Sequence, residues 1–296
     1  MSARLAIALM WLLHWLPLPA LAALGRAFGA VLYRIARQRR AVVRVNLELC
    51  FPGMGKAERE ALAREHFKVL ARSMLERGVL WWGSRARLDR LVRVDNEHIV
   101  RRLQAEGRPV ILLSPHFVGL DAGGTAITSR FDIVSIYARQ SDPLFDHWLH
   151  HGRSRFGDQL LLARDAGPRA TVRAMKSGRP FYYLPDMNFR TGDVLFVPFF
   201  GVPAATITGL PRLARLAGAA IVPCPTRMLP GGKGYVVEIG EPWADYPSDD
   251  LEADVRRMNE WIESVVRTMP EQYYWVHRRF KRRPEGARKV YRRSRG

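Results

Sequence analysis

His116 and Asp121 are the residues of this 296-residue chain whose types and surroundings best suit chemistry. His116 follows shortly after the apolar run 110–113, which is typical of a buried strand in a parallel sheet. Open α/β sheets hold their ligands just beyond the carboxyl ends of such strands. A histidine placed there can take a proton from a substrate, and a carboxylate on its second ring nitrogen would fix the tautomer. The junction therefore indicates proton-transfer chemistry.

The spacing of the pair limits how the two side chains can meet. In one regular helix they would point about 140° apart, because each residue advances the helix by ~100°. They can meet if His116 lies in a turn and Asp121 in the first turn of the next helix, and Pro115 and Gly119 favour such a break. A helix-capping aspartate beside a structural histidine would produce the same sequence pattern. The residues alone leave both interpretations open.

The apolar pattern elsewhere predicts the elements that position this junction. Residues 56–82 carry apolar side chains at helical spacing, so the N-terminal portion is expected to be helical. We expect a last helix over 251–268, and strands over 109–113, 133–137, 181–184, 220–224 and 235–239. Strands that alternate with helices predict an α/β fold with a mainly parallel, mixed sheet flanked by helices. No repeat or change of composition marks a second domain.

The N-terminus predicts a membrane anchor over residues 1–25. Leu5 to Gly25 contains no Lys, Arg, Asp or Glu, and six arginines follow before Glu48. About 20 apolar residues can span a bilayer, and the basic flank predicts that the rest of the chain stays on the cytoplasmic side. A cleaved signal peptide is one alternative. A kinked helix lying in the interface is another, because Pro17 and Pro19 divide the segment.

Charge and cysteine content narrow the partners. The chain has 47 Lys and Arg against 28 Asp and Glu, a net charge of +19, which favours a polyanionic partner such as nucleic acid, anionic lipid or an acidic carrier protein. The basic tail 284–296 would either keep the chain soluble or contact anionic headgroups. Cys50 and Cys224 lie far apart, and their surroundings show no metal-ligand spacing. The chain also contains no phosphate-loop pattern. We expect no metal and no other cofactor.

Several blocks in a fixed order resemble the bacterial lipid A late acyltransferases, the lauroyl and myristoyl transferases of the lysophospholipid acyltransferase superfamily. Their hallmark is the His-x-x-x-x-Asp/Glu motif that His116 and Asp121 match. The similar blocks are residues 46–52, 116–121, 139–143, 152–157, 183–186, 196–201 and 270–281. The resemblance implies one acyltransferase domain over 26–283 with a lysophospholipid acyltransferase-like fold, and it implies that His116 and Asp121 are catalytic.

The resemblance also implies a reaction and its partners. A fatty acyl chain of the lauroyl or myristoyl class would pass from an acyl carrier protein thioester to a hydroxyl of a lipid A precursor, a tetraacyl disaccharide with sugar attached. This would take place at the bacterial inner membrane, on the cytoplasmic side. The nearest alternative is a glycerolipid acyltransferase that uses the same His and Asp on a lysophospholipid. The apolar N-terminus and the absence of a recognisable binding module argue against a nucleic-acid-binding protein, so no nucleic acid is expected. A membrane scaffold would leave the ordered blocks unexplained.

Five further residues are candidate substrate contacts. Arg153 and Arg155 belong to the family-like block 152–157, and we expect one of them to face the site, where it could stabilise an oxyanion. Arg164 is a weaker candidate of the same kind. Arg139 would contact an acceptor phosphate by the same resemblance. Asp186 ends another predicted strand, so it could lie beside His116 or simply form a turn.

Overall fold

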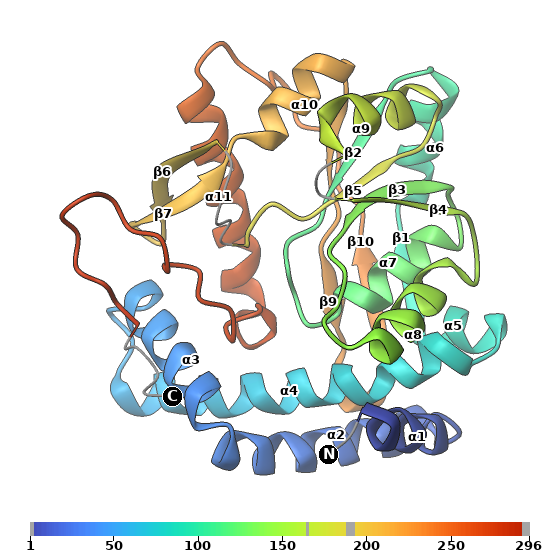
Figure 1. Cartoon of the computed structure of the whole chain (residues 1–296), viewed down its shortest axis with the longest axis vertical. Coiled ribbons are helices and arrows are strands. Elements are labelled where there is room, and N and C mark those ends of the chain that lie inside the picture. Colours follow the sequence, from blue (N-terminus) through green and yellow to red (C-terminus); the bar gives the residue numbers. More distant parts are fainter. Residues whose placement is uncertain (1–2, 164–165, 188–192, 292–296) are drawn as a thin grey trace.

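A parallel sheet forms the centre of the molecule (Figure 1). The computed structural model describes residues 3–163, 166–187 and 193–291. Within these residues the sheet has five strands in the order β4-β3-β5-β2-β8. Their bounds are Gln159–Ala163, Ile133–Tyr137, Phe181–Tyr183, Val110–Leu113 and Ala220–Pro223. The central β2 pairs in parallel with β5 and β8, with Ile111 opposite Phe181 and Ile221. The predicted α/β class is confirmed.

Helices connect these strands and cover the sheet (Figure 1). They are α6 (Glu97–Ala105), α7 (Leu120–Thr128), α8 (Pro143–Ser154), α9 (Gly167–Lys176) and α10 (Gly209–Ala217). Every residue of β2 is buried. Because β2 and β5 are parallel neighbours, the loops that follow them leave the sheet at the same edge.

Two smaller β-structures complete the fold. β1 (Val92–Asp95) pairs in parallel with β10 (Tyr235–Glu238), and β9 (Thr226–Met228) pairs with β10 in the antiparallel direction. The predicted strand at 235–239 is thus present, but it lies outside the main sheet. β6 (Val194–Phe199) and β7 (Val202–Ile207) form an antiparallel hairpin that packs on α11 (Leu251–Thr268).

The N-terminal third is helical, as predicted. It contains α1 (Ala3–Leu13), α2 (Leu18–Ile35), α3 (Arg37–Cys50), α4 (Lys56–Trp82) and α5 (Arg85–Leu91). Figure 1 shows α4 crossing below the sheet, with α2 alongside it.

The predicted anchor helix over residues 1–25 differs from the structure in its boundaries. The helix ends at Leu13 and a new one starts at Leu18, because Pro17 cannot continue the first helix. The second helix then runs past Arg26 to Ile35. Among the described residues α2 is the one helix whose length and composition would suffice to cross a membrane.

Candidate active site

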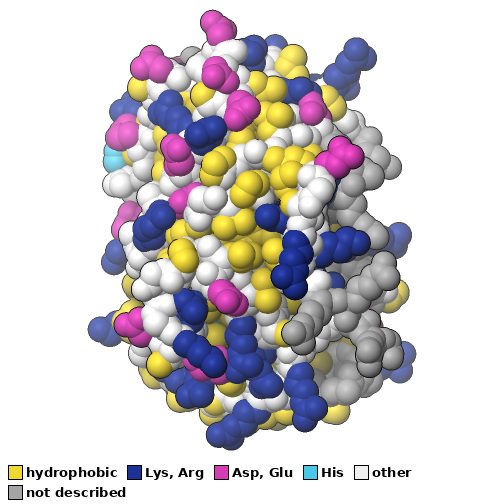
Figure 2. All heavy atoms as spheres, turned by 90° about the vertical axis from the view of Figure 1, so that its left-hand side faces the viewer, with side chains coloured by type: hydrophobic (Ala, Val, Ile, Leu, Met, Phe, Trp, Pro, Cys, Tyr) yellow, Lys and Arg dark blue, Asp and Glu magenta, His cyan; other side chains and the backbone are white. Residues whose placement is uncertain are grey.

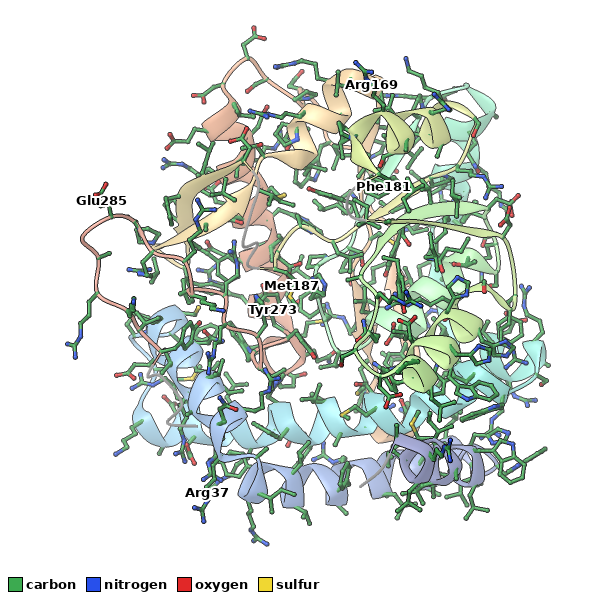
Figure 3. All side chains as sticks on the ribbon, viewed as in Figure 1. Arg37, Arg169, Phe181, Met187, Tyr273 and Glu285 are labelled. Carbon is green, nitrogen blue, oxygen red and sulfur yellow. The ribbon has the colours of Figure 1, made fainter. Side chains whose placement is uncertain are left out.

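The loop after β2 holds His116 through backbone contacts with the C-terminal segment 270–280, which we call the strap. The backbone N–H of Tyr274 donates to the His116 carbonyl at 2.9 Å, and that of Val118 donates to the Gln272 carbonyl at 2.9 Å. Phe117 and Tyr273 form an isolated antiparallel bridge between these contacts. Figure 3 shows Tyr273 and Met187 together above α4, between the sheet and α11. The backbone on both sides of His116 is therefore fixed.

Asp186 orients the His116 ring. Ring Nδ1 of His116 lies 2.7 Å from Oδ1 of Asp186, and the backbone N–H of His116 donates to the same carboxylate at 3.0 Å. Asp186 is only 1% exposed. It follows β5, the strand beside β2, which brings together two residues far apart in the sequence. An ionised carboxylate can only accept, so Nδ1 carries the proton and Nε2 is left with a free lone pair.

The environment keeps the Asp186 carboxylate ionised. Burial raises its pKa, but the nearby His116 and its hydrogen bonds, with a further one from Tyr273, hold the pKa below the usual value. This is the arrangement in which a carboxylate stabilises an imidazolium as it forms. The interpretation of Asp186 as a mere turn former is thereby set aside.

Asp121 has different partners from those predicted. It lies in the first turn of α7, as expected, but its carboxylate pairs with Arg77 at 2.6 Å and Arg153 at 2.7 Å. The predicted hydrogen bond to His116 is therefore wrong, because His116 Nδ1 donates to Asp186 instead. Burial raises the pKa of Asp121, but the two guanidinium groups outweigh it and hold that pKa far below the usual range. Asp121 is thus an anchor for two arginines.

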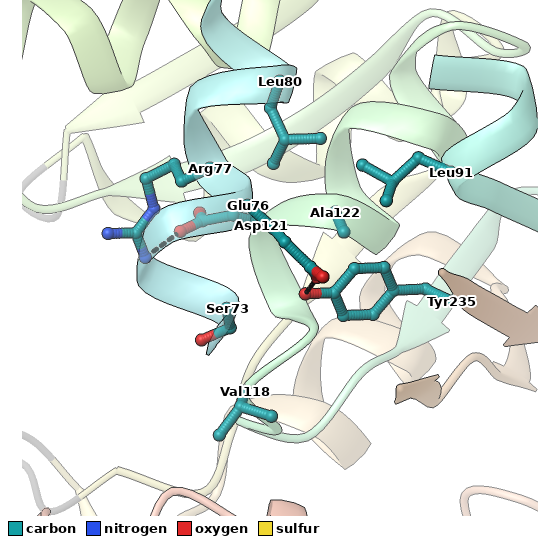
Figure 4. Close-up of a pocket in the computed structure, with 9 residues that line it drawn as sticks. All are labelled: Ser73, Glu76, Arg77, Leu80, Leu91, Val118, Asp121, Ala122 and Tyr235. Atoms are coloured by element: carbon teal, nitrogen blue, oxygen red, sulfur yellow. Dashed lines mark hydrogen bonds and ion pairs between the residues drawn. The ribbon is translucent and has the colours of Figure 1, made fainter. Parts of the chain in front are cut away.

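Arg77 is a site residue that the sequence did not reveal. It lies on α4, and Figure 4 shows its guanidinium against Asp121 in a small pocket that Val118 and Ala122 also line. Its side chain is 20% exposed. Nothing in the sequence distinguishes Arg77 from the many other arginines.

A second charged group on α4 fixes this helix to β10. Arg72 Nε lies 2.7 Å from Glu76, and the Tyr235 hydroxyl donates to Glu76 at 2.6 Å (Figure 4). Arg72 also donates to the Leu229 carbonyl at 2.6 Å. Burial raises the pKa of Glu76 against the effect of Arg72 and Tyr235. Because Glu76 precedes Arg77, this group sets the position from which Arg77 reaches Asp121.

The remaining arginine candidates separate clearly. Arg153 reaches the site through Asp121, whereas Arg155 lies over the Phe156 ring and donates to the Leu80 carbonyl. The Arg139 side chain is 90% exposed, with its nearest carboxylate at 3.8 Å, so the structure does not bring it to His116. Arg164 lies outside the described residues.

The family-like blocks at 46–52 and 270–281 meet behind the strap. The buried Asn46 amide donates to the carbonyls of Trp275 at 2.7 Å and His277 at 2.8 Å, and its oxygen accepts from the Tyr291 hydroxyl. His277 is kept neutral, because burial, with the charges of Arg279 and His116, lowers its pKa to about 4. Asn46 thus secures the segment that holds His116.

Metal-ligating side chains do not gather in the described part of the chain: no group of three or more His, Cys, Asp or Glu could hold an ion there.

Comparison with known proteins identifies the family of this chain. Residues 2–282 match the family model described as bacterial lipid A biosynthesis acyltransferase. The lipid A biosynthesis lauroyltransferase of Escherichia coli strain K12 is 35% identical, over 97% of this chain and 94% of that protein. The palmitoleoyltransferase of the same organism is 32% identical (96% and 92%), and its myristoyltransferase is 30% identical (93% and 84%). The chain belongs to the bacterial lipid A biosynthesis acyltransferases.

Proposed function

We propose that this enzyme moves a fatty acyl chain of the lauroyl or myristoyl class from an acyl carrier protein thioester to a hydroxyl of a lipid A precursor. The observation that carries the proposal is the 2.7 Å contact between His116 Nδ1 and the buried Asp186, which leaves Nε2 free to act as a base. Such a base is what a hydroxyl needs in order to become a nucleophile.

The reaction needs one proton transfer in each direction. Nε2 of His116 takes the proton of the acceptor hydroxyl while its oxygen attacks the thioester carbonyl. Asp186 stabilises the imidazolium that results. When the tetrahedral intermediate collapses, the C–S bond breaks, and the imidazolium returns its proton to the departing thiolate. The products are the new ester and the free carrier thiol, and His116 is regenerated.

The arginine pair supplies positive charge at the start of α7, the helix that follows the His116 loop. Arg153 keeps 26% of its side chain exposed and Arg77 keeps 20%, so both can present N–H groups to a substrate anion. We assign Arg153 to the developing oxyanion, where fixed donors contribute most. Asp121 then acts as a positioning residue for Arg153.

The names of the relatives support a fatty acyl group as the group transferred and lipid A as the acceptor class. Those named above are lauroyl, palmitoleoyl and myristoyl transferases, and the most similar of the three carries the lauroyl name. The net charge of +19 suits both an acidic carrier protein and a phosphorylated glycolipid. The acceptor is the tetraacyl disaccharide with its sugar attached, reached from the cytoplasmic face of the inner membrane.

A transfer assay tests this function. The protein in detergent receives lauroyl, myristoyl and palmitoleoyl carrier-protein thioesters in turn, with the tetraacyl precursor, with and without its sugar, as acceptor. We expect transfer by the wild type and by His98→Ala, whose histidine is exposed on α6, and a loss of about 100-fold or more in His116→Ala. Transfer to a lysophospholipid instead would identify the glycerolipid alternative. Equal rates in the two variants would contradict the proposal.

A further inference from the structure

Large apolar side chains lie exposed on one part of the molecule. Of the fourteen exposed large hydrophobic side chains among the described residues, nine belong to α1, α2 and the turn between them. They are Leu5, Leu9, Trp11, Leu12, Trp15, Leu24, Phe28, Val31 and Ile35. A soluble surface rarely gathers so many, and such a patch marks a site of interaction. We call α1 and α2 together the docking helices.

The opposite face of α2 packs closely on α4. A Cβ added at Gly25 would lie 2.4 Å from the Cα of Arg72, and one at Gly29 would lie 2.4 Å from the Cα of Lys68. The two backbones are therefore in direct contact. Small residues at four-residue spacing allow such an approach.

Polar contacts join the same two helices. Arg26, in the middle of α2, forms an ion pair with Glu65, and the Tyr33 hydroxyl donates to Glu60. If α2 crossed a bilayer, it would have to leave these partners or draw charged residues of α4 into hydrocarbon, which costs several kcal/mol for each unpaired group. α2 exposes large apolar side chains on its free side, and its polar residues Arg26 and Tyr33 have partners on α4, which suits a helix lying in an interface.

The charge and aromatic residues at the ends of this surface fit anionic lipid. Figure 3 shows Arg37 pointing away from the molecule at the level of α2, and Arg34 is exposed beside it. Neither forms an ion pair with a described residue. In Figure 2, Lys and Arg side chains gather at the lower end of the face, where α2 and α3 lie in Figure 1. Trp11 and Trp15 are of the type enriched at membrane interfaces.

We propose that the docking helices lie flat in the surface of a bilayer with anionic headgroups, both on the same side, so that no segment of 3–35 crosses the membrane. α4 rests on them and touches the start of the strap, where His66 Nδ1 lies 2.9 Å from the Glu271 carbonyl. One helix layer of about 10 Å therefore separates the bilayer surface from the machinery around His116. A lipid acceptor would have to move out of the bilayer by only about this thickness to reach His116.

Cysteine labelling tests the topology without any use of acyl transfer. Cys50 and Cys224 are buried, so a membrane-impermeant maleimide would report introduced cysteines. Arg4→Cys and Gln38→Cys, both at exposed positions, are placed separately in the full chain in oriented membrane vesicles. We expect both to react in inside-out vesicles and neither in right-side-out ones. Reaction of Arg4→Cys in right-side-out vesicles alone would show a spanning segment and overturn the proposal.

A matched pair of substitutions tests the surface itself. Leu12 on α1 is 62% exposed and Leu216 on α10, at the far end of the molecule in Figure 1, is 59% exposed. With vesicles of phosphatidylethanolamine and phosphatidylglycerol, we expect Leu12→Glu to lower partitioning by about tenfold. Leu216→Glu should leave it unchanged. Equal partitioning of the two variants would contradict the proposal. If Leu12→Glu alone lowers partitioning but the transfer assay shows no acyl transfer, the docking surface is supported and the proposed reaction is not.

Discussion

His116 and Asp186 stand 70 residues apart in the chain, yet the ring Nδ1 of one lies 2.7 Å from a carboxylate oxygen of the other. Asp121, five residues from His116, instead holds Arg77 and Arg153. The family motif thus contributes its two residues to two different units of the site. One unit handles the proton and the other carries the positive charge.

The arginine unit predicts coupled losses at Asp121 and Arg77. Asp121→Asn removes the charge that holds both guanidinium groups, so we expect kcat to fall by about 100-fold. The loss of kcat in Arg77→Gln should be smaller, because Arg153 remains paired with Asp121. In the double variant the losses should not add, because the residues share one contact. Arg155→Gln, a neighbour of Arg153 that points elsewhere, is the control. Simple addition of the losses would contradict a shared unit.

The contact of Asn46 with the strap predicts a loss of stability. Asn46→Ala removes the amide that donates to the carbonyls of Trp275 and His277, which should lower the free energy of unfolding by about 2–4 kcal/mol. Urea unfolding followed by tryptophan fluorescence measures it. Gln38→Ala removes an exposed amide and should change nothing. An unchanged midpoint for Asn46→Ala would show that the strap is held by other contacts.

Buried neutral histidines predict a loss of stability in acid. Burial lowers the pKa of His66 to about 4, against the weaker opposite effect of its hydrogen bond with Glu271. A histidine whose folded pKa is depressed must bind its proton on unfolding, so its contribution is present above pH ~6.5 and is lost as the pH falls toward about 4. We expect Tm to drop across this window, and His66→Gln to flatten the drop. His98→Gln, at an exposed position, should not. Parallel profiles for the wild type and His66→Gln would contradict this origin.

The contact between α2 and α4 predicts which glycines tolerate a methyl group. Gly25→Ala would place its Cβ against the Arg72 backbone, so the helices must separate, at a cost of about 1–3 kcal/mol. Gly53→Ala meets no atom within 4 Å and serves as the control. Thermal unfolding in detergent compares them. Equal Tm values would show that the two helices are not in fixed contact.

Some strands of this fold can be predicted from local sequence and others cannot. β2 is buried on both faces, so its short apolar run was legible, whereas β6 and β7 contain Pro198 and Pro203, which local rules place outside strands. Asp186 was expected at the rim because it ends such a run.

The partners at the site were less predictable. Spacing in the chain allowed Asp121 to meet His116 across a turn, and the resemblance implied that both residues are catalytic. The observed partner, Asp186, depends on the parallel pairing of β2 with β5. Arg77 comes from a helix far earlier in the chain, and only tertiary packing brings it to Asp121. Local sequence therefore identified the atoms capable of chemistry more readily than their pairs.

The most direct test of the His116–Asp186 pair is a double-mutant cycle on kcat. Acyl transfer from lauroyl carrier protein to the lipid A precursor is compared for His116→Ala, Asp186→Asn and the double variant, under matched folding. Because Asp186 acts only through His116, we expect Asp186→Asn to lose about 10²- to 10⁴-fold, and the double variant to be no slower than His116→Ala. A wild-type rate in Asp186→Asn, or a double variant slower by the product of the two losses, would contradict the proposed catalytic pair.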